Sequence, residues 1–292
     1  MSSNAVVRRR MESAESLGDV VTTMKSLASV RVHQYRRTMR ALDASTLTLD
    51  RAARALLQLH PELATEASSG GGANTITVVF GSDRGLCGPF NDRMARFAAA
   101  GAADGTRQGA LRSVVAIGRR VGRRLRAADV ELVAQLPAPS GLGSLDTAVA
   151  ELLAVVETYR QGDSEDRVLL VYARPVGATR FEPRTVQVLP VDPVWMRGLA
   201  AKRWETGKRP MELSEPAAMV RGLIRHRMAL AFVKAYGSSL AAENAARLSA
   251  MEAASKNVED RLASLRSAHH AARQAAVTAE LLDIQSAADA LE

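Results

Sequence analysis

Apolar residues recur about every 3.5 positions along the first part of the chain, which is typical of a coiled-coil helix. From Asp19 to His60 no glycine or proline interrupts it. Only Gly18, Lys25 and Thr46 break the apolar seam. The pattern predicts one long N-terminal helix that packs against a partner helix. Its a and d positions are Met11, Ala14, Gly18, Val21, Lys25, Ala28, Val32, Tyr35, Met39, Leu42, Thr46, Leu49, Ala53 and Leu56.

A second long helix is predicted at the other end of the chain. Ser238–Glu292 contains no glycine, proline or aromatic residue, enough for a helix of roughly 80 Å at 1.5 Å per residue. We expect this helix to begin between Met211 and Pro216 and to continue through Gly222 and Gly237.

The apolar ladder of this second helix changes character along its length. Beyond Leu265 almost every apolar position is alanine. If the two long helices pair antiparallel, the N-terminal one ends near this point and the rest of the C-terminal helix projects alone. Small side chains would allow this helix to fit inside a narrow channel of a partner. Alanine is equally suited to any solvent-exposed helix, so both interpretations stay open. The ladder is Leu240, Leu248, Met251, Val258, Leu262 and Leu265.

Between the long helices, short β-branched and apolar runs alternate with helical segments, a pattern typical of an open and largely parallel sheet. Leu145–Arg160 is an amphipathic helix, the Ser68–Gly72 run is a loop, and Pro190–Pro210 is predicted to be an irregular exit. The last strand is expected to be antiparallel to its neighbour. The predicted strands are Thr75–Phe80, Ser113–Ile117, Glu131–Leu136, Val168–Tyr172 and Thr185–Leu189.

The predicted fold class is therefore α/β plus coiled coil. Residues 1–60 and 211–292 would form one antiparallel rod, and residues 73–192 a doubly wound, mostly parallel, Rossmann-like domain. Two long helices around a small domain suggest a mechanical part more than a catalyst.

Composition narrows the classes of partner and compartment. The net charge of +8 and the pI near 10.2 predict acidic partners. The single cysteine, Cys87, excludes an internal disulfide and a zinc site of several cysteines. We expect no signal peptide, because no apolar run follows Arg8–Arg10, and no span of the ~20 apolar residues that cross a bilayer.

The densest local motif is Ser82-Asp83-Arg84-Gly85-Leu86-Cys87-Gly88, directly after a predicted strand. Glycines there can cradle a phosphate at a helix N-terminus. However, Gly81, Gly85 and Gly88 lack the G-x-G-x-x-G spacing, and no G-K-[ST] follows. A tight strand-to-helix turn is the favoured interpretation, with Cys87 a packed residue and not a nucleophile.

Two further motifs have ordinary interpretations. Val115–Arg124 runs from a strand into a basic helix, which could bind phosphate, although a solvated basic face is the commoner arrangement. His269 and His270 are adjacent on a helix and face different directions, so they do not form a metal pair. No residues are predicted to be catalytic, to hold a cofactor or to bind a metal.

With these motifs, the chain resembles the gamma subunit of F-type ATP synthases, the central shaft of a rotary motor. Ser82–Gly88 is that family's S-D-R-G-L-C-G motif. Glu243–Met251 is similar to its S-E-x-A-A-R-M-x-A-M, and Ala272–Ile284 to its A-R-Q-A-x-I-T-x-E-L-x-E-I. Met24–Arg31 stands where the family has K-A-M-x-M-V-A-A-S-K. The chain departs from the family at Pro89 and Ala287, where glycine is usual.

The resemblance implies a non-catalytic rotor shaft that couples ion flow to ATP synthesis or hydrolysis. Its partners would be the hexamer of alpha and beta subunits, the epsilon subunit and the membrane c-ring, on the cytoplasmic face of the bacterial plasma membrane. Residues matching family positions that face the hexamer are Met24, Arg31, Arg247, Arg273, Gln274 and Thr278.

Two other functions stay open from the sequence. A nucleotide-dependent α/β enzyme with helical arms would need to bind ATP or a dinucleotide despite the missing phosphate-loop spacing. A basic coiled-coil protein that binds nucleic acid would show an affinity that falls steeply with salt.

Overall fold

The computed structural model describes residues 3–62, 75–105, 113–160, 166–177, 179–202, 204, 211 and 214–289. The predicted loop Ser68–Gly72 and the Gly207 and Pro210 breaks lie outside these residues. The chain divides into two compact units, one made of Met1–Ala28 with Leu248–Glu292 and one made of Ser29–Arg247. The segments predicted above (1–60, 73–192 and 211–292) stay a prediction of domain organisation.

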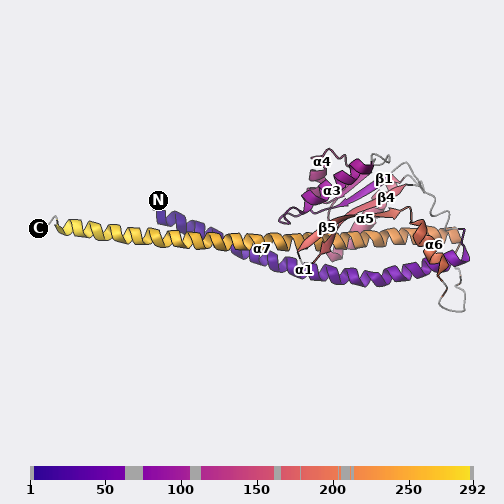
Figure 1. The fold of residues 1–292 in the computed structure, drawn as a ribbon, viewed down its shortest axis with the longest axis horizontal. Coiled ribbons are helices and arrows are strands. Elements are labelled where there is room, and N and C mark those ends of the chain that lie inside the picture. The colour runs from indigo at the N-terminus through magenta and orange to yellow at the C-terminus, as the bar shows by residue number, and fades with distance from the viewer. Residues whose placement is uncertain are drawn as a thin grey trace. The chain divides into compact units, whose positions relative to one another are not determined.

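Two uninterrupted helices account for both ends of the chain. Helix α1 spans Ser3–Leu59 and helix α7 spans Pro216–Asp289 (Figure 1). Helix α7 begins at the end of the predicted window and continues through Gly222 and Gly237. Every predicted seam position of α1 is buried or half-buried, and none is exposed. The heptad register read from the sequence is therefore the inward face of α1.

In the unit of residues 1–28 and 248–292, the two helices run antiparallel. A Cβ built on Gly18 would lie 3.5 Å from Cγ1 of Val258, an ordinary contact distance. Earlier in α1, Glu15 Oε1 lies 3.5 Å from Nη2 of Arg266, which comes later in α7. The glycine that interrupts the seam thus faces a β-branched side chain, with enough space between them for a Cβ.

The unit of residues 29–247 repeats the antiparallel order. Lys234 Nζ donates to Thr46 Oγ1 at 2.6 Å, and any side chain at Gly237 would overlap Met39. Thr46, the last break in the seam, therefore serves as a hydrogen-bond acceptor for a lysine that reaches across from α7.

The final part of α7 leaves its partner, as the antiparallel pairing predicts. Leu265 is the last buried residue among those described, and residues 273–279 are all exposed. Large apolar side chains on this segment are exposed too: Val277, Leu281, Leu282 and Ile284 are 50–67% exposed.

The α/β part of the second unit is a five-stranded sheet in the order β3-β2-β1-β4-β5. The first four strands are parallel, and β5 is antiparallel to β4. The chain builds outward from β1 to β3 and then crosses back to β4 on the other side of β1. The strands are β1 (Thr75–Phe80), β2 (Ser113–Ile117), β3 (Ala134–Leu136), β4 (Arg167–Val176) and β5 (Arg180–Leu189).

Helices cover both faces of this sheet, which is the doubly wound arrangement predicted. Helices α3 (Phe90–Gly105) and α4 (Arg119–Arg126) lie on one face, and α5 (Leu145–Tyr159) on the other (Figure 1). On the α5 face, Tyr236 of α7 packs edge-on against Phe80, with ring centroids 4.9 Å apart. The buried part of α7 around Tyr236 thus closes the core that a free-standing sheet would expose to water.

Three element boundaries differ from the sequence-based expectation. The predicted strand Glu131–Leu136 is reduced to Ala134–Leu136, because β3 is an edge strand that pairs only with the last residues of β2. Strands β4 and β5 are longer than predicted and contain Pro175 and Pro183. Proline is tolerated there because β5 is an edge strand and the paired register of β4 with β1 stops at Val171.

The prediction of an irregular segment over Pro190–Pro210 was wrong for its first part. Pro193–Ala201 forms helix α6. Asp192 caps it, with its Oδ1 accepting from the backbone N–H of Val194 at 2.8 Å. Pro193 stands at the first turn, where its fixed φ favours a helix start, so the proline that signalled a break instead begins an element.

Candidate functional site

The Ser82–Gly88 motif forms the turn from β1 into α3. Leu86 and Gly88 have φ of 62° and 54°, so the backbone reverses sharply here. Buried polar groups hold the turn closed: the Asn91 side chain accepts from Ser82 N at 3.0 Å and donates to Ser82 Oγ at 2.8 Å. The motif is therefore a structured turn, as the sequence favoured.

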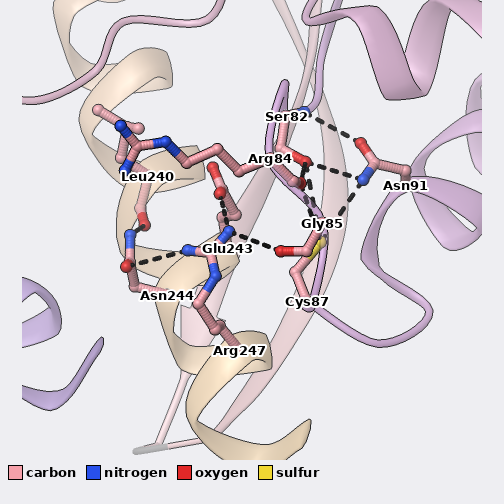
Figure 2. Close-up of polar contacts among 9 residues, drawn as sticks. All are labelled: Ser82, Arg84, Gly85, Cys87, Asn91, Leu240, Glu243, Asn244 and Arg247. Atoms are coloured by element: carbon pink, nitrogen blue, oxygen red, sulfur yellow. Dashed lines mark hydrogen bonds and ion pairs between the residues drawn. The ribbon is translucent and has the colours of Figure 1, made fainter. Parts of the chain in front are cut away.

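Cys87 is a packed residue, as predicted. It is 3% exposed, and its sulfur lies 3.8 Å from Ser82 Oγ (Figure 2). Burial raises the pKa of the Cys87 thiol above its ordinary value, against the opposing hydrogen bond from Ser82. A thiol held protonated in this way is a poor nucleophile.

Asp83 occupies the N-terminus of α4, at the junction of Val115–Arg124 that could have bound a phosphate. Its Oδ1 accepts from the backbone N–H of Arg119 at 2.7 Å, at the first residue of α4. Its Oδ2 accepts from the N–H of Ala138 at 3.0 Å, beyond the end of β3. Helix N-termini after parallel strands are anion sites, and here the chain supplies its own anion. This disfavours the nucleotide-enzyme alternative.

A buried ion pair within α7 contacts the same turn. Arg247 Nη2 lies 2.5 Å from Glu243 Oε1, and both side chains are 8% exposed. Arg247 also donates to the carbonyl oxygen of Gly85 at 3.2 Å and to Asn244 Oδ1 at 3.2 Å (Figure 2). Because the guanidinium contacts both the helix and the turn, it fixes the Ser82–Gly88 turn to α7.

Other charges surround this pair. Arg84 extends from the turn along α7 past Glu243 (Figure 2). Burial raises the pKa of the Glu243 carboxyl, while Arg247 and then Arg84 act in the opposite direction. Burial likewise raises the pKa of Tyr35 in α1, opposed by Arg31. The cluster therefore connects α1, α7 and the turn within one unit.

The residues expected to face a partner have different environments in the structure. Arg273, Gln274 and Thr278 are exposed on α7, and Thr278 Oγ1 donates to the Gln274 carbonyl at 2.9 Å. In α1, Met24 and Arg31 are half-buried. Arg247, by contrast, is buried among this chain's own groups. Partner contact stays a prediction for all six residues.

Sequence reasoning did not assign roles to Asp83, Asn91 or Glu243. A signal existed for one of them, because Glu243 and Arg247 are four residues apart on a helix, a spacing that brings opposite charges together. The bonds of Asp83 to Arg119 and Ala138 link distant segments, so no local pattern could have revealed them.

Within the described ranges, no three histidine, cysteine, aspartate or glutamate side chains gather in a way that could hold a metal ion. No helix in the same residues combines the length and apolar character needed to cross a membrane.

Comparison with known proteins agrees with this architecture. A family model described as ATP synthase matches residues 3–291. An ATP synthase gamma chain of Anaeromyxobacter sp. (strain Fw109-5) is 30% identical over 297 residues, covering 98% of each chain. One from Ruminococcus albus is 27% identical over 283 residues, covering 96% of each.

Solved structures share the fold. A chain in the Euglena gracilis mitochondrial ATP synthase (OSCP/F1/c-ring, rotational state 3) has a TM-score of 0.64 at 20% identity, with 99% of this chain and 94% of that chain covered. A chain in the central stalk/c-ring structure of the Tetrahymena thermophila enzyme has a TM-score of 0.59 at 21% identity, with 81% and 99% covered.

These findings define a subunit of a rotary ATP synthase. The chain belongs to the ATP synthase gamma chain family. Its role is that of the rotor shaft, a subunit of the complex that is not itself catalytic.

Proposed function

We propose that this chain transmits rotation between the c-ring and a hexamer of alpha and beta subunits at the cytoplasmic face of a bacterial plasma membrane. In this proposal ATP is made and hydrolysed on the beta subunits, and the epsilon subunit and c-ring hold the α/β part. The family membership and the three matching motifs support these assignments.

The exposed end of α7 is the observation that carries the proposal. Arg273, Gln274 and Thr278 lie on a single helix that no other described segment covers. Exposed apolar side chains, Val277 and Ile284 among them, accompany these polar groups. A helix with both kinds of side chain is suited to an interior that offers hydrogen bonds and apolar walls.

The proposed mechanism follows from asymmetry. One shaft inside three equivalent beta subunits presents a different face to each of them, so each adopts a different conformation. Turning the shaft changes the nucleotide affinity of each beta subunit in order, which couples rotation to binding. Arg273 and Gln274 would hydrogen-bond an acidic lever loop of beta at one angle and release it at the next. Solvent-exposed ion pairs contribute only about 0–1 kcal/mol each, so such contacts break readily.

The test uses the full chain, tagged and co-expressed with the alpha and beta subunits. We expect co-purification of a stoichiometric complex with ATPase activity. Changing Arg273 and Gln274 together to alanine should lower the ATPase rate about tenfold, which corresponds to about 1.4 kcal/mol. The reason is that two contacts made at one rotary angle are lost.

A matched control is present on the same helix. Lys256 and Asn257 are also an exposed cation followed by an exposed amide. Changing both to alanine should leave the ATPase rate within about twofold. Recovery of the chain without alpha and beta would refute the shaft role, and equal losses in both double variants would refute the assignment of Arg273 and Gln274.

A further inference from the structure

A basic cavity of about 370 Å³ lies beside the Ser82–Gly88 turn. Residues 85–88 of the turn and the first turn of α3 form one part of its lining, and Arg120, Arg123 and Arg124 of α4 form another. All of these residues belong to the unit of residues 29–247. The volume is at the lower end of the roughly 300–1,000 Å³ typical of small-molecule pockets.

The positive charge of this cavity is only partly neutralised. Arg124 Nε lies 2.7 Å from Asp92 Oδ1, so one lining arginine is paired. Arg120 and Arg123 form no ion pair with any residue that the structure describes. They are three positions apart on α4 and so share a face of the helix. Two neighbouring like charges therefore face one small space.

The arginines stand on a rigidly held element. Val121 and Leu125 are 0% exposed beneath α4. A Cβ on Gly122 would lie 2.8 Å from Gln135 Oε1, so the helix packs closely on the sheet. Arg120 crosses the turn at Gly85, where a Cβ would lie 2.6 Å from Nη2. The absence of a side chain at Gly85 leaves room for this guanidinium.

We propose that this cavity binds the phosphate group of a small anion between Arg120 and Arg123. Guanidinium groups present paired N–H donors that match phosphate oxygens in bidentate fashion, and a phosphate brings enough negative charge for both arginines. The site differs from the N-terminus of α4, which Asp83 already occupies. It does not depend on the rotor role, because every group belongs to this chain.

The test measures inorganic phosphate binding to the full chain by calorimetry at constant ionic strength. We expect saturable binding at one site. In Arg120→Gln/Arg123→Gln, binding should weaken at least tenfold. The control Arg126→Gln/Arg197→Gln changes two exposed arginines outside the cavity and removes the same charge. It should bind phosphate within about twofold of the unaltered chain.

Separate titrations with pyrophosphate and ATP under the same conditions distinguish free phosphate from the phosphate of a larger molecule. Binding of inorganic phosphate but not ATP indicates free phosphate, and tighter binding of ATP indicates the larger molecule. In the unaltered chain, phosphate should also shift the NMR signals of the Arg120 and Arg123 side-chain N–H groups. Absence of saturable binding by all three anions would overturn the proposal. Equal weakening of phosphate binding in Arg120→Gln/Arg123→Gln and in the control variant would also overturn it. The same holds if an acidic hexapeptide binds and none of the three anions does.

Discussion

Replacing Arg247 by methionine tests whether the buried ion pair holds the turn to α7. Methionine keeps an unbranched chain suited to a helix but removes the guanidinium. Glu243 would then be buried without the group that lies 2.5 Å from it, and the Gly85 carbonyl would lose a donor. Removing one partner of a buried pair costs about 3–5 kcal/mol. We expect a loss of that size in urea unfolding of the full chain at pH 7.

The loss should depend on pH in a defined direction. Burial raises the pKa of Glu243 in the folded chain, and Arg247 opposes this shift. Without Arg247 the pKa rises further above the ordinary value of 4.5. A raised folded-state pKa contributes stability below the unfolded-state pKa and loses it as pH rises through the folded-state value. The deficit of Arg247→Met should therefore shrink as pH falls toward 4.5.

Two further variants isolate the cause. Glu243→Gln combined with Arg247→Met removes both charges and should recover most of the loss, leaving about 1 kcal/mol. Arg266→Met breaks the exposed pair with Glu15, whose side chains are 58% and 51% exposed, and should cost no more than about 1 kcal/mol. Equal losses for Arg247→Met and Arg266→Met at pH 7 would refute the reasoning.

Three other predictions concern packing. Gly118 has φ of 102°, and a Cβ there would lie 2.8 Å from backbone atoms of Ser82. Gly118→Ala should therefore lower the free energy of urea unfolding by about 3 kcal/mol. As a control, Gly198→Ala replaces a helical glycine with open space around it and should raise that free energy by up to about 1 kcal/mol. Leu42→Asp places a carboxylate on the half-buried seam and should destabilise by about 2 kcal/mol; an equal effect of Ala41→Asp on the exposed face would contradict the register. Because burial raises the pKa of Cys87, iodoacetamide should modify the folded chain about a hundredfold more slowly at pH 8 than the urea-unfolded chain, and equal rates would exclude this packing.

Much of the fold could be predicted because its signals are local. The seam of α1 is a heptad repeat, and a repeat fixes which face turns inward without knowledge of the partner. The strands β1 and β2 are apolar runs of the length that a doubly buried parallel strand requires. Helix α6 was missed because Pro193 can end or begin a helix, and only the cap at Asp192 decides between them.

The candidate site was less predictable, since its geometry depends on segments far apart in sequence. The Ser82–Gly88 motif could be recognised as a turn, but not that Arg247 would bind the Gly85 carbonyl, 162 residues away. The partner of Asp83 is likewise set by the folding of α4 onto the sheet. Residue types reveal that a charge needs a partner, and only the packed structure shows which partner it has.

The carboxylate of Asp83 determines whether the stability of this end of the sheet depends on a dissociable ligand. Domains that receive a dissociable ligand at the same place gain stability in proportion to the logarithm of its concentration, and they loosen when it leaves. Here the group at the first N–H of α4 is covalently part of the chain. Its occupancy does not vary with metabolite supply, so the stability of this junction is independent of metabolite concentration.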